Sequence, residues 1–196
     1  MLKIVTAPNS ILSQTAKPVA KIDKAILTLI EEMEHALLSA KDPEGVGLAA
    51  PQVDRSLQIF LAKPTPKSPI QVFVNPRITL NSANQNADKR PKTTQRKSAV
   101  RSAKISDALK KLEGCLSLPN IWGEVIRDPH IAISYLDEKG NTHNRKFQGL
   151  FATIIQHELD HLNGIIFPKR VLEQKGTLYK SHKDEKNEDV FEEIEI

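Results

Sequence analysis

Apolar residues recur at helical spacing in the N-terminal quarter of the chain. From Ile26 to Leu37 they return every three or four positions, which places them on one face of a helix. Asp23 stands just before this pattern, where its carboxylate can accept hydrogen bonds from the N–H groups of the first turn. We therefore predict a helix at 23–40.

A second helical pattern runs from Gly149 to Leu162. Apolar side chains such as Ile155 and Leu159 again fall on one face and can pack inward. Gly164 follows the pattern at the place where a glycine commonly ends a helix. This stretch predicts a helix that lies against the core.

Short apolar runs bounded by proline, glycine and polar turn residues predict strands. These runs lie at 57–62, 71–74, 124–127, 130–136 and 142–147. A turn at 137–140 joins the last two runs, which favours an antiparallel pair, and we expect a loop at 45–52. The pattern predicts an α+β fold, with short, mostly antiparallel strands packed around a central helix and an N-terminal helix beside them.

One long stretch, at about 81–110, breaks the pattern. It is polar and has no hydrophobic periodicity except at 105–112, where a short helix could form, so we predict a mobile insert. Residues 81–112 contain nine lysines and arginines against two acids, whereas the last thirteen residues contain seven acids and one lysine. We interpret the chain as a single catalytic domain at 1–180 followed by an acidic tail at 181–196.

Length and composition fit one globular domain. The chain has 196 residues, of which 39% are hydrophobic and 27% charged, and it can bury a substantial core. No apolar run approaches the ~18 residues of a membrane helix. The N-terminus lacks the apolar segment of a secretory signal, so we expect a cytoplasmic protein with no membrane partner. The single cysteine excludes an internal disulfide.

The chemistry is concentrated in the second predicted helix. His157 and His161 are four residues apart, so both imidazoles project from one face and can bind one metal ion. Glu158 follows the first histidine, where it can take a proton from a water molecule on the ion. The segment therefore predicts a metal-dependent hydrolase.

The third ligand has three candidates. One protease class supplies a histidine ten residues after the first, but Phe167 stands there. Another class uses a downstream glutamate, and Glu173 lies in that direction without an apolar helical pattern to carry it. Cys115 could instead supply a thiolate for Zn²⁺ or Fe²⁺ and leave a fourth position for water. A lone cysteine is often simply buried, but Gly114 before it and Pro119 after it favour a specially shaped strand edge.

Three motifs follow one another along the chain. They are GVGLAAPQ at 45–52, EGCLS at 113–117 and HELDHLNG at 157–164. With these motifs in this order, the chain resembles the peptide deformylase family over roughly residues 1–172, apart from the insert. The resemblance implies removal of the N-terminal formyl group from formyl-methionine of nascent polypeptides.

The resemblance also implies roles for individual residues. Cys115, His157 and His161 would bind one divalent ion, Fe²⁺ in the cell and often Zn²⁺, Ni²⁺ or Co²⁺ after purification. Water on the ion would act as hydroxide, and Glu158 would accept its proton as general base and then protonate the departing amine as general acid. The side-chain amide of Gln52 and the backbone N–H of Leu116 would stabilise the oxyanion.

A substrate cavity is expected next to these groups. The residues expected to bind substrate are Gly45, Val46, Gly47, Glu113, Trp122, Leu150 and Ile154. The methionine side chain would enter an apolar pocket, with Trp122 near its rim. Asp160 points away from the metal face, and Arg127 is a candidate to pair with Glu113 or Asp160.

Two other functions remain open at this point. One is a metal-dependent amidase or peptidase that acts on another acylated amine, with the insert reshaping its pocket. The other is a non-catalytic protein that binds the ribosome or RNA on an enzyme scaffold. The insert itself has three interpretations: a surface loop, a lid, or a basic segment that contacts ribosomal RNA through its phosphates.

Overall fold

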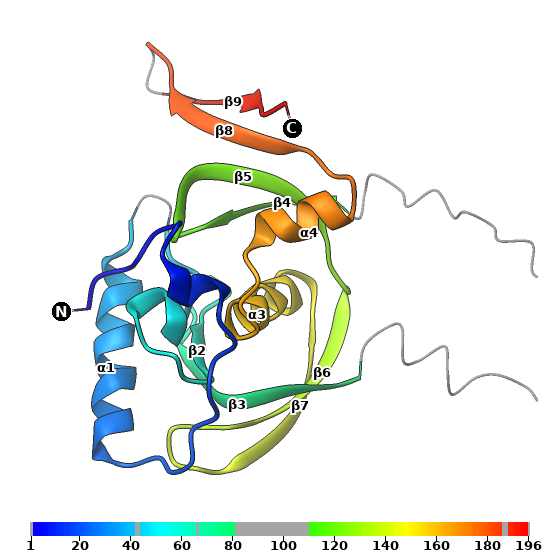
Figure 1. The fold of residues 1–196 in the computed structure, drawn as a ribbon. Coiled ribbons are helices and arrows are strands. Elements are labelled where there is room, and N and C mark those ends of the chain that lie inside the picture. Colours follow the sequence, from blue (N-terminus) through cyan, green and yellow to red (C-terminus); the bar gives the residue numbers. More distant parts are fainter. Residues whose placement is uncertain (1, 42–43, 66, 81–109, 186–187, 196) are drawn as a thin grey trace, which may run out of the picture.

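The computed structural model describes residues 2–41, 44–65, 67–80, 110–185 and 188–195. Its elements form two antiparallel sheets with a helix, α3 (Gly149–Leu162), in the middle of the molecule (Figure 1). The predicted α+β fold with antiparallel strands around a central helix is confirmed. The predicted basic insert lies almost entirely outside the described residues.

The larger sheet contains five strands in the order β1-β2-β3-β6-β7. Their bounds are Gly47–Ala49 (β1), Ile59–Ala62 (β2), Gln71–Leu80 (β3), His130–Leu136 (β6) and Thr142–Gln148 (β7). Strand β2 is buried along its whole length, because the sheet is covered on both faces. Phe60 packs in the cluster that includes α3, whereas Ile59 and Leu61 pack in the cluster that includes α1. This explains why the sequence there is a continuous apolar run and not an alternating one.

The smaller sheet contains four strands in the order β4-β5-β8-β9. Their bounds are Lys110–Cys115 (β4), Leu118–Ile126 (β5), Leu178–Lys183 (β8) and Asp189–Glu193 (β9). Helix α4 (Phe167–Glu173) packs on this sheet, where Phe167 and Val171 join Val125 and Leu178 in one buried cluster. The same cluster contains Cys115, so the packing of α4 helps to fix the end of β4.

Helix α1 (Lys24–Ser39) begins where the sequence predicts. The Asp23 carboxylate accepts a hydrogen bond from the N–H of Ile26 at 3.0 Å, as expected for a helix cap. Two short 3-10 turns, η1 (Ser10–Ser13) and η2 (Ala50–Val53), pack near the start of the larger sheet. The second turn and β1 occupy the stretch that the sequence predicts to be a loop.

Two other expectations differ from the structure. Residues 110–112, expected at the end of a short helix, belong to strand β4. Half of the acidic C-terminal segment at 181–196, expected to be loosely held, lies in β8 and β9, because β8 pairs with β5 and β9 pairs with β8. Figure 1 shows this hairpin as an outer layer beside β5.

The helices of the described ranges are too short or too polar to cross a membrane.

Candidate metal centre

Three potential ligands meet where the smaller sheet approaches α3. Cys115 ends β4, and His157 and His161 lie one turn apart on α3. One ligand atom from each residue lies within 4.8 Å of the others, and the Cys115 Sγ is 3.2 Å from the His161 Nε2. A thiolate with two imidazoles suits Zn²⁺ or Fe²⁺. The arrangement favours Cys115 over Phe167 and Glu173, the two other positions considered for the third ligand.

Glu113 sets the orientation of the first histidine. Its Oε2 lies 3.0 Å from the Nδ1 of His157, so the ring can donate a hydrogen bond there and leave Nε2 to face the other ligands. A carboxylate in this position fixes the tautomer and the ring plane of a metal-binding histidine. Glu113 was expected to contact substrate, and it lines the cavity as well.

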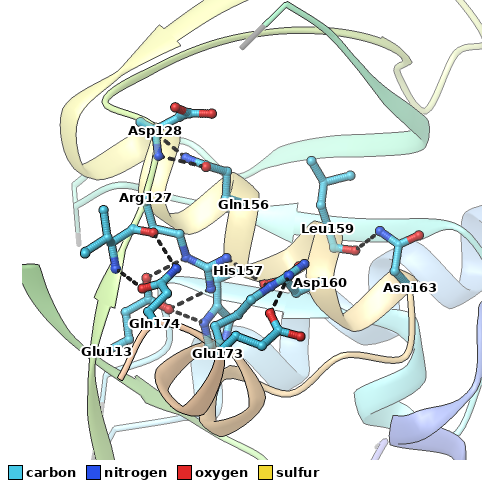
Figure 2. A network of polar contacts seen from close by, with 12 residues as sticks. Glu113, Arg127, Asp128, Gln156, His157, Leu159, Asp160, Asn163, Glu173 and Gln174 are labelled. Atoms are coloured by element: carbon cyan, nitrogen blue, oxygen red, sulfur yellow. Dashed lines mark hydrogen bonds and ion pairs between the residues drawn. The ribbon is translucent and has the colours of Figure 1, made fainter. Parts of the chain in front are cut away.

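Arg127 links two buried carboxylates behind the ligands. Its guanidinium donates to Glu113 through Nε and Nη2, each at 2.9 Å, and to Asp160 through Nη1 at 2.6 Å. Figure 2 shows this network beside α3. Burial alone would raise the pKa of Glu113, but the hydrogen bonds from Arg127 and His157 outweigh it and lower that pKa to about 2. Glu113 therefore stays ionised over the physiological range.

Helix α4 extends the network. Arg170 donates to Asp160 through Nη2 at 2.7 Å and through Nε at 3.1 Å, and it also pairs with Glu173 at 3.0 Å. Asp160 is buried and receives two arginines, so it lies behind the metal face as expected. Arg170 was not among the predicted site residues, because it follows Lys169 in a short segment with no distinct sequence signal.

Glu158 lies in the cavity between the ligands and β1. It is only 3% exposed, and burial raises its pKa to about 7, although His157 opposes this. Gly47 makes its position possible, because a Cβ at that glycine would overlap the Glu158 Oε1. Within the described residues, Glu158 Oε2 and His161 Nδ1 are buried polar atoms without a hydrogen-bond partner. An unpaired carboxylate oxygen beside three ligands fits a site that holds an ion and a water molecule.

Both the oxygen and the nitrogen of the Gln52 side-chain amide are hydrogen-bonded. Its Oε1 accepts a hydrogen bond from the Ala49 N–H at 2.8 Å, and its Nε2 lies 3.2 Å from the Ser117 Oγ and 3.5 Å from the Cys115 Sγ. The amide therefore directs its donor toward the ligand cluster. Leu116 follows Cys115 and also lines the cavity. Ser117 belongs to the EGCLS motif, but no role was predicted for it.

A cavity of about 200 Å³ opens beside these groups. All of the residues that were expected to bind substrate line it: Gly45, Val46, Gly47, Glu113, Trp122, Leu150 and Ile154. The structure adds Glu44, Leu112, Gly114 and Thr153. Leu112 is 46% exposed, and its place directly before the EGCLS motif is the sequence signal that could have identified it.

The cavity lies between two sheet edges. Strand β1 is the edge of the larger sheet, and β4 is the edge of the smaller one. Gly45 to Gly47 and Leu112 to Cys115 both line the cavity. Edge strands present unpaired backbone N–H and C=O groups, so an extended chain placed between them can pair with both.

Comparisons with known proteins agree with this geometry. The family model for polypeptide deformylase matches residues 1–176. The peptide deformylase of Prochlorococcus marinus strain SARG is 34% identical over 178 residues, which cover 89% of this chain and 75% of that protein. The peptide deformylase of Synechocystis is 36% identical over 166 residues, covering 83% of this chain and 75% of that protein.

Solved structures agree as well. The crystal structure of peptide deformylase from Thermotoga maritima has a TM-score of 0.68 at 30% identity and covers 87% of this chain and 97% of that one. A peptide deformylase from Synechococcus elongatus in complex with actinonin has a TM-score of 0.68 at 31% identity, covering 86% and 78%.

Proposed function

This chain belongs to the polypeptide deformylase family, and we propose that it removes the N-terminal formyl group from formyl-methionine of nascent polypeptides in a metal-dependent hydrolysis. Membership of the family makes it an enzyme. The observation that carries the metal-dependent mechanism is the convergence of Cys115, His157 and His161 with the unpaired carboxylate oxygen of Glu158.

Cys115, His157 and His161 would hold one divalent ion. When bound, such an ion lowers the pKa of its water ligand toward neutrality and polarises a carbonyl oxygen. We propose Fe²⁺ as the ion in the cell, with Zn²⁺, Ni²⁺ or Co²⁺ able to replace it, because these ions share a preference for thiolate and imidazole ligands.

Glu158 is the proposed proton carrier. A carboxyl group whose pKa lies near 7 is suited to take a proton from water and to return it within the same cycle. In the first step Glu158 accepts the proton as the water oxygen attacks the formyl carbon. In the second step it gives the proton to the methionine nitrogen as the carbon–nitrogen bond breaks, and formate and a free amine result.

Gln52 and Leu116 are the proposed oxyanion donors. Attack places negative charge on the formyl oxygen, and a preorganised N–H donor at that oxygen typically contributes about 3 kcal/mol to lowering the barrier. The Gln52 amide is fixed by the Ala49 N–H and by Ser117, so it needs no reorganisation. Leu116 directly follows the Cys115 ligand and lines the same cavity, which supports its backbone N–H as the second donor.

The substrate peptide would lie between β1 and β4. An extended chain can add to a free sheet edge through backbone hydrogen bonds, and Gly45, Gly47 and Gly114 line the cavity at these two edges. The apolar wall formed by Val46, Leu150 and Ile154 then receives the methionine side chain. Because this substrate is made on ribosomes, we propose a cytoplasmic location. Contact with ribosomal RNA through its phosphates is one of the three interpretations of the basic insert at 81–110.

The test is hydrolysis of formyl-Met-Ala-Ser by protein prepared without oxygen and loaded with Fe²⁺ or Ni²⁺. Wild type is expected to release formate, Glu158→Ala to lose most of this activity while it keeps its metal, and Cys115→Ser to lose both. Glu31→Ala, on the exposed side of α1, serves as the carboxylate control and is expected to behave as wild type. Hydrolysis of acetyl-Met-Ala-Ser at the same rate, or no turnover with a full metal site, would contradict the proposal.

A further inference from the structure

The C-terminal hairpin contacts the wall of the substrate cavity. The hairpin of β8 and β9 begins at Leu178, just beyond the residues that match the family model. Strand β8 pairs with β5 and places Tyr179 opposite Trp122. On the other side of β5, Trp122 lies opposite Gly114 of β4. The tryptophan therefore stands between the hairpin and the strand that ends at Cys115.

Trp122 is held by contacts on several sides. Its ring lies so close to Gly114 that a Cβ at that glycine would be 2.9 Å from two ring atoms. Its Nε1 donates a hydrogen bond to the Ser181 Oγ at 3.0 Å. The ring of Phe191 meets it edge-on, with centroids 5.8 Å apart and planes at 79°. A hydrogen bond at the polar end and an edge-to-face ring contact together fix an indole in one orientation.

Both supporting residues belong to one face of the hairpin. Ser181 is paired with Phe191 across β8 and β9, and directly paired residues project to the same side of a sheet. The neighbouring pair, Lys180 and Glu192, projects to the other side. The register of the hairpin therefore presents a hydroxyl group and an aromatic ring to Trp122 at the same time.

We propose that Ser181 and Phe191 are positioning residues, and that through Trp122 they determine how tightly the enzyme binds the peptide residues that follow formyl-methionine. The proposal rests on the proposed function. Cys115 lies at the bond to be cut, and Gly114 is its neighbour on β4. A peptide that runs along β4 away from Cys115 passes Gly114 and the Trp122 ring with the residues after its methionine.

The kinetic test compares formyl-Met-Ala-Ser with formyl-methionine amide, which has no following residue. For Ser181→Ala and Phe191→Ala, the KM for the tripeptide is expected to rise about fivefold, the effect of losing roughly 1 kcal/mol of binding, while its kcat stays near wild type. The KM for the amide should stay unchanged. Ser181→Thr keeps the hydroxyl and should restore the tripeptide KM. Glu192→Ala is the control on the opposite face.

Trp122 is the single tryptophan of the chain, so its fluorescence gives a readout without substrate. Emission should shift to longer wavelength in Ser181→Ala and Phe191→Ala, because the indole loses a fixed partner and becomes more exposed to water. Emission of Glu192→Ala should match wild type. Unchanged emission in both variants would overturn the positioning role. A KM that rises equally for both substrates, or a kcat that falls for both, would overturn the link to peptide length. Failure of wild type to hydrolyse either substrate would reject the proposed function, while the emission would still test the positioning of Trp122.

Discussion

Close approach between β1 and α3 decides where Glu158 lies. The backbone of Gly47 passes directly over the Glu158 carboxylate, and a methyl group there would lie 2.7 Å from its Cδ and still closer to Oε1. Glycine is the residue that leaves this space open. At this position the geometry of the proposed proton carrier is set by a residue that contributes no chemistry.

Gly47→Ala is therefore expected to lower kcat/KM for formyl-Met-Ala-Ser by roughly a hundredfold, since a misplaced reacting group commonly costs about that factor. The added methyl group displaces Glu158 and not the ligands, so metal content should stay near wild type. Steady-state kinetics with metal analysis checks this. Gly140→Ala is the control, because a Cβ there meets nothing within 4 Å. Unchanged kcat/KM in Gly47→Ala would show that Glu158 can move without loss.

Glu113 makes the stability of the folded protein depend on pH, and the direction of this dependence follows from its pKa. Its pKa falls from an ordinary 4.5 to about 2 in the folded protein, so its contribution to stability is complete above about pH 4.5. That contribution is lost as the pH falls from there to 2. For this buried group the shift corresponds to about 3 kcal/mol. Urea unfolding of chelator-treated protein across this range is the measurement.

Glu113→Gln is the comparison for this prediction. The variant should be less stable than wild type at neutral pH, because Arg127 loses its charged partner, and its stability should vary less between pH 4.5 and pH 2. If both proteins show the same slope in this range, Glu113 is not the group responsible.

Single-residue roles could be predicted where local spacing carries the chemistry. His157, Glu158 and His161 lie on one helical face, so the sequence alone brings them together. Arg170 could not be found in this way, because its contact with Asp160 depends on how α4 packs against the smaller sheet. Nothing in the local sequence encodes that packing.

At the scale of elements, the end of α3 is fixed against the N-terminal segment. Gly164 follows the helix with φ of 68°, and a Cβ there would lie 2.7 Å from the backbone carbonyl carbon and oxygen of Ser13. Gly140 has a similar φ of 81° but open space around it. The two glycines share a backbone conformation and differ in what surrounds them.

Alanine at the two positions should therefore have different effects on the free energy of unfolding. Gly140→Ala should cost about 1 kcal/mol from the left-handed conformation alone. Gly164→Ala should cost roughly 1–3 kcal/mol more, because the backbone of Ser13 must move. Chemical denaturation of both variants is the test. Equal losses of unfolding free energy would mean that the backbone of Ser13 can move without cost.

Elements with a strong internal pattern were predicted well. Strand β6 and helix α3 match the predicted bounds, since each shows its own periodicity and turn signals. Strands β8 and β9 were missed because their sequence is charged and short of apolar residues. Their stability comes from pairing with β5 and with each other, which is a long-range property.

At the scale of the whole molecule, the candidate metal site joins the two sheets. Cys115 comes from the edge of the smaller sheet, whereas His157 and His161 come from a helix that packs on the larger one. An ion held by all three would connect the two halves. Loss of the ion should therefore lower the stability of both halves, and not only of the site.

Metal removal is therefore expected to lower global stability as well as activity. Zn²⁺ at about a hundred times its Kd should raise the free energy of unfolding by about 2.7 kcal/mol relative to chelated protein. Thermal unfolding checks this, and backbone hydrogen exchange should speed up in both β4 and α3 on chelation. Cys115→Ser should lose the metal effect, whereas His35→Ala on α1 should keep it. A metal effect of equal size in Cys115→Ser would exclude Cys115 as a ligand.

Strand β9 has a further consequence for how copies of the chain behave in solution. It forms the outer edge of the smaller sheet, and its residues include Asp189, Glu192 and Glu193. Two such edges brought together would place like charges opposite each other, and charged edge strands resist pairing between molecules. The acidic C-terminus thus protects an edge that would otherwise be open to self-association, and this protection should weaken in acid or when these side chains are neutralised.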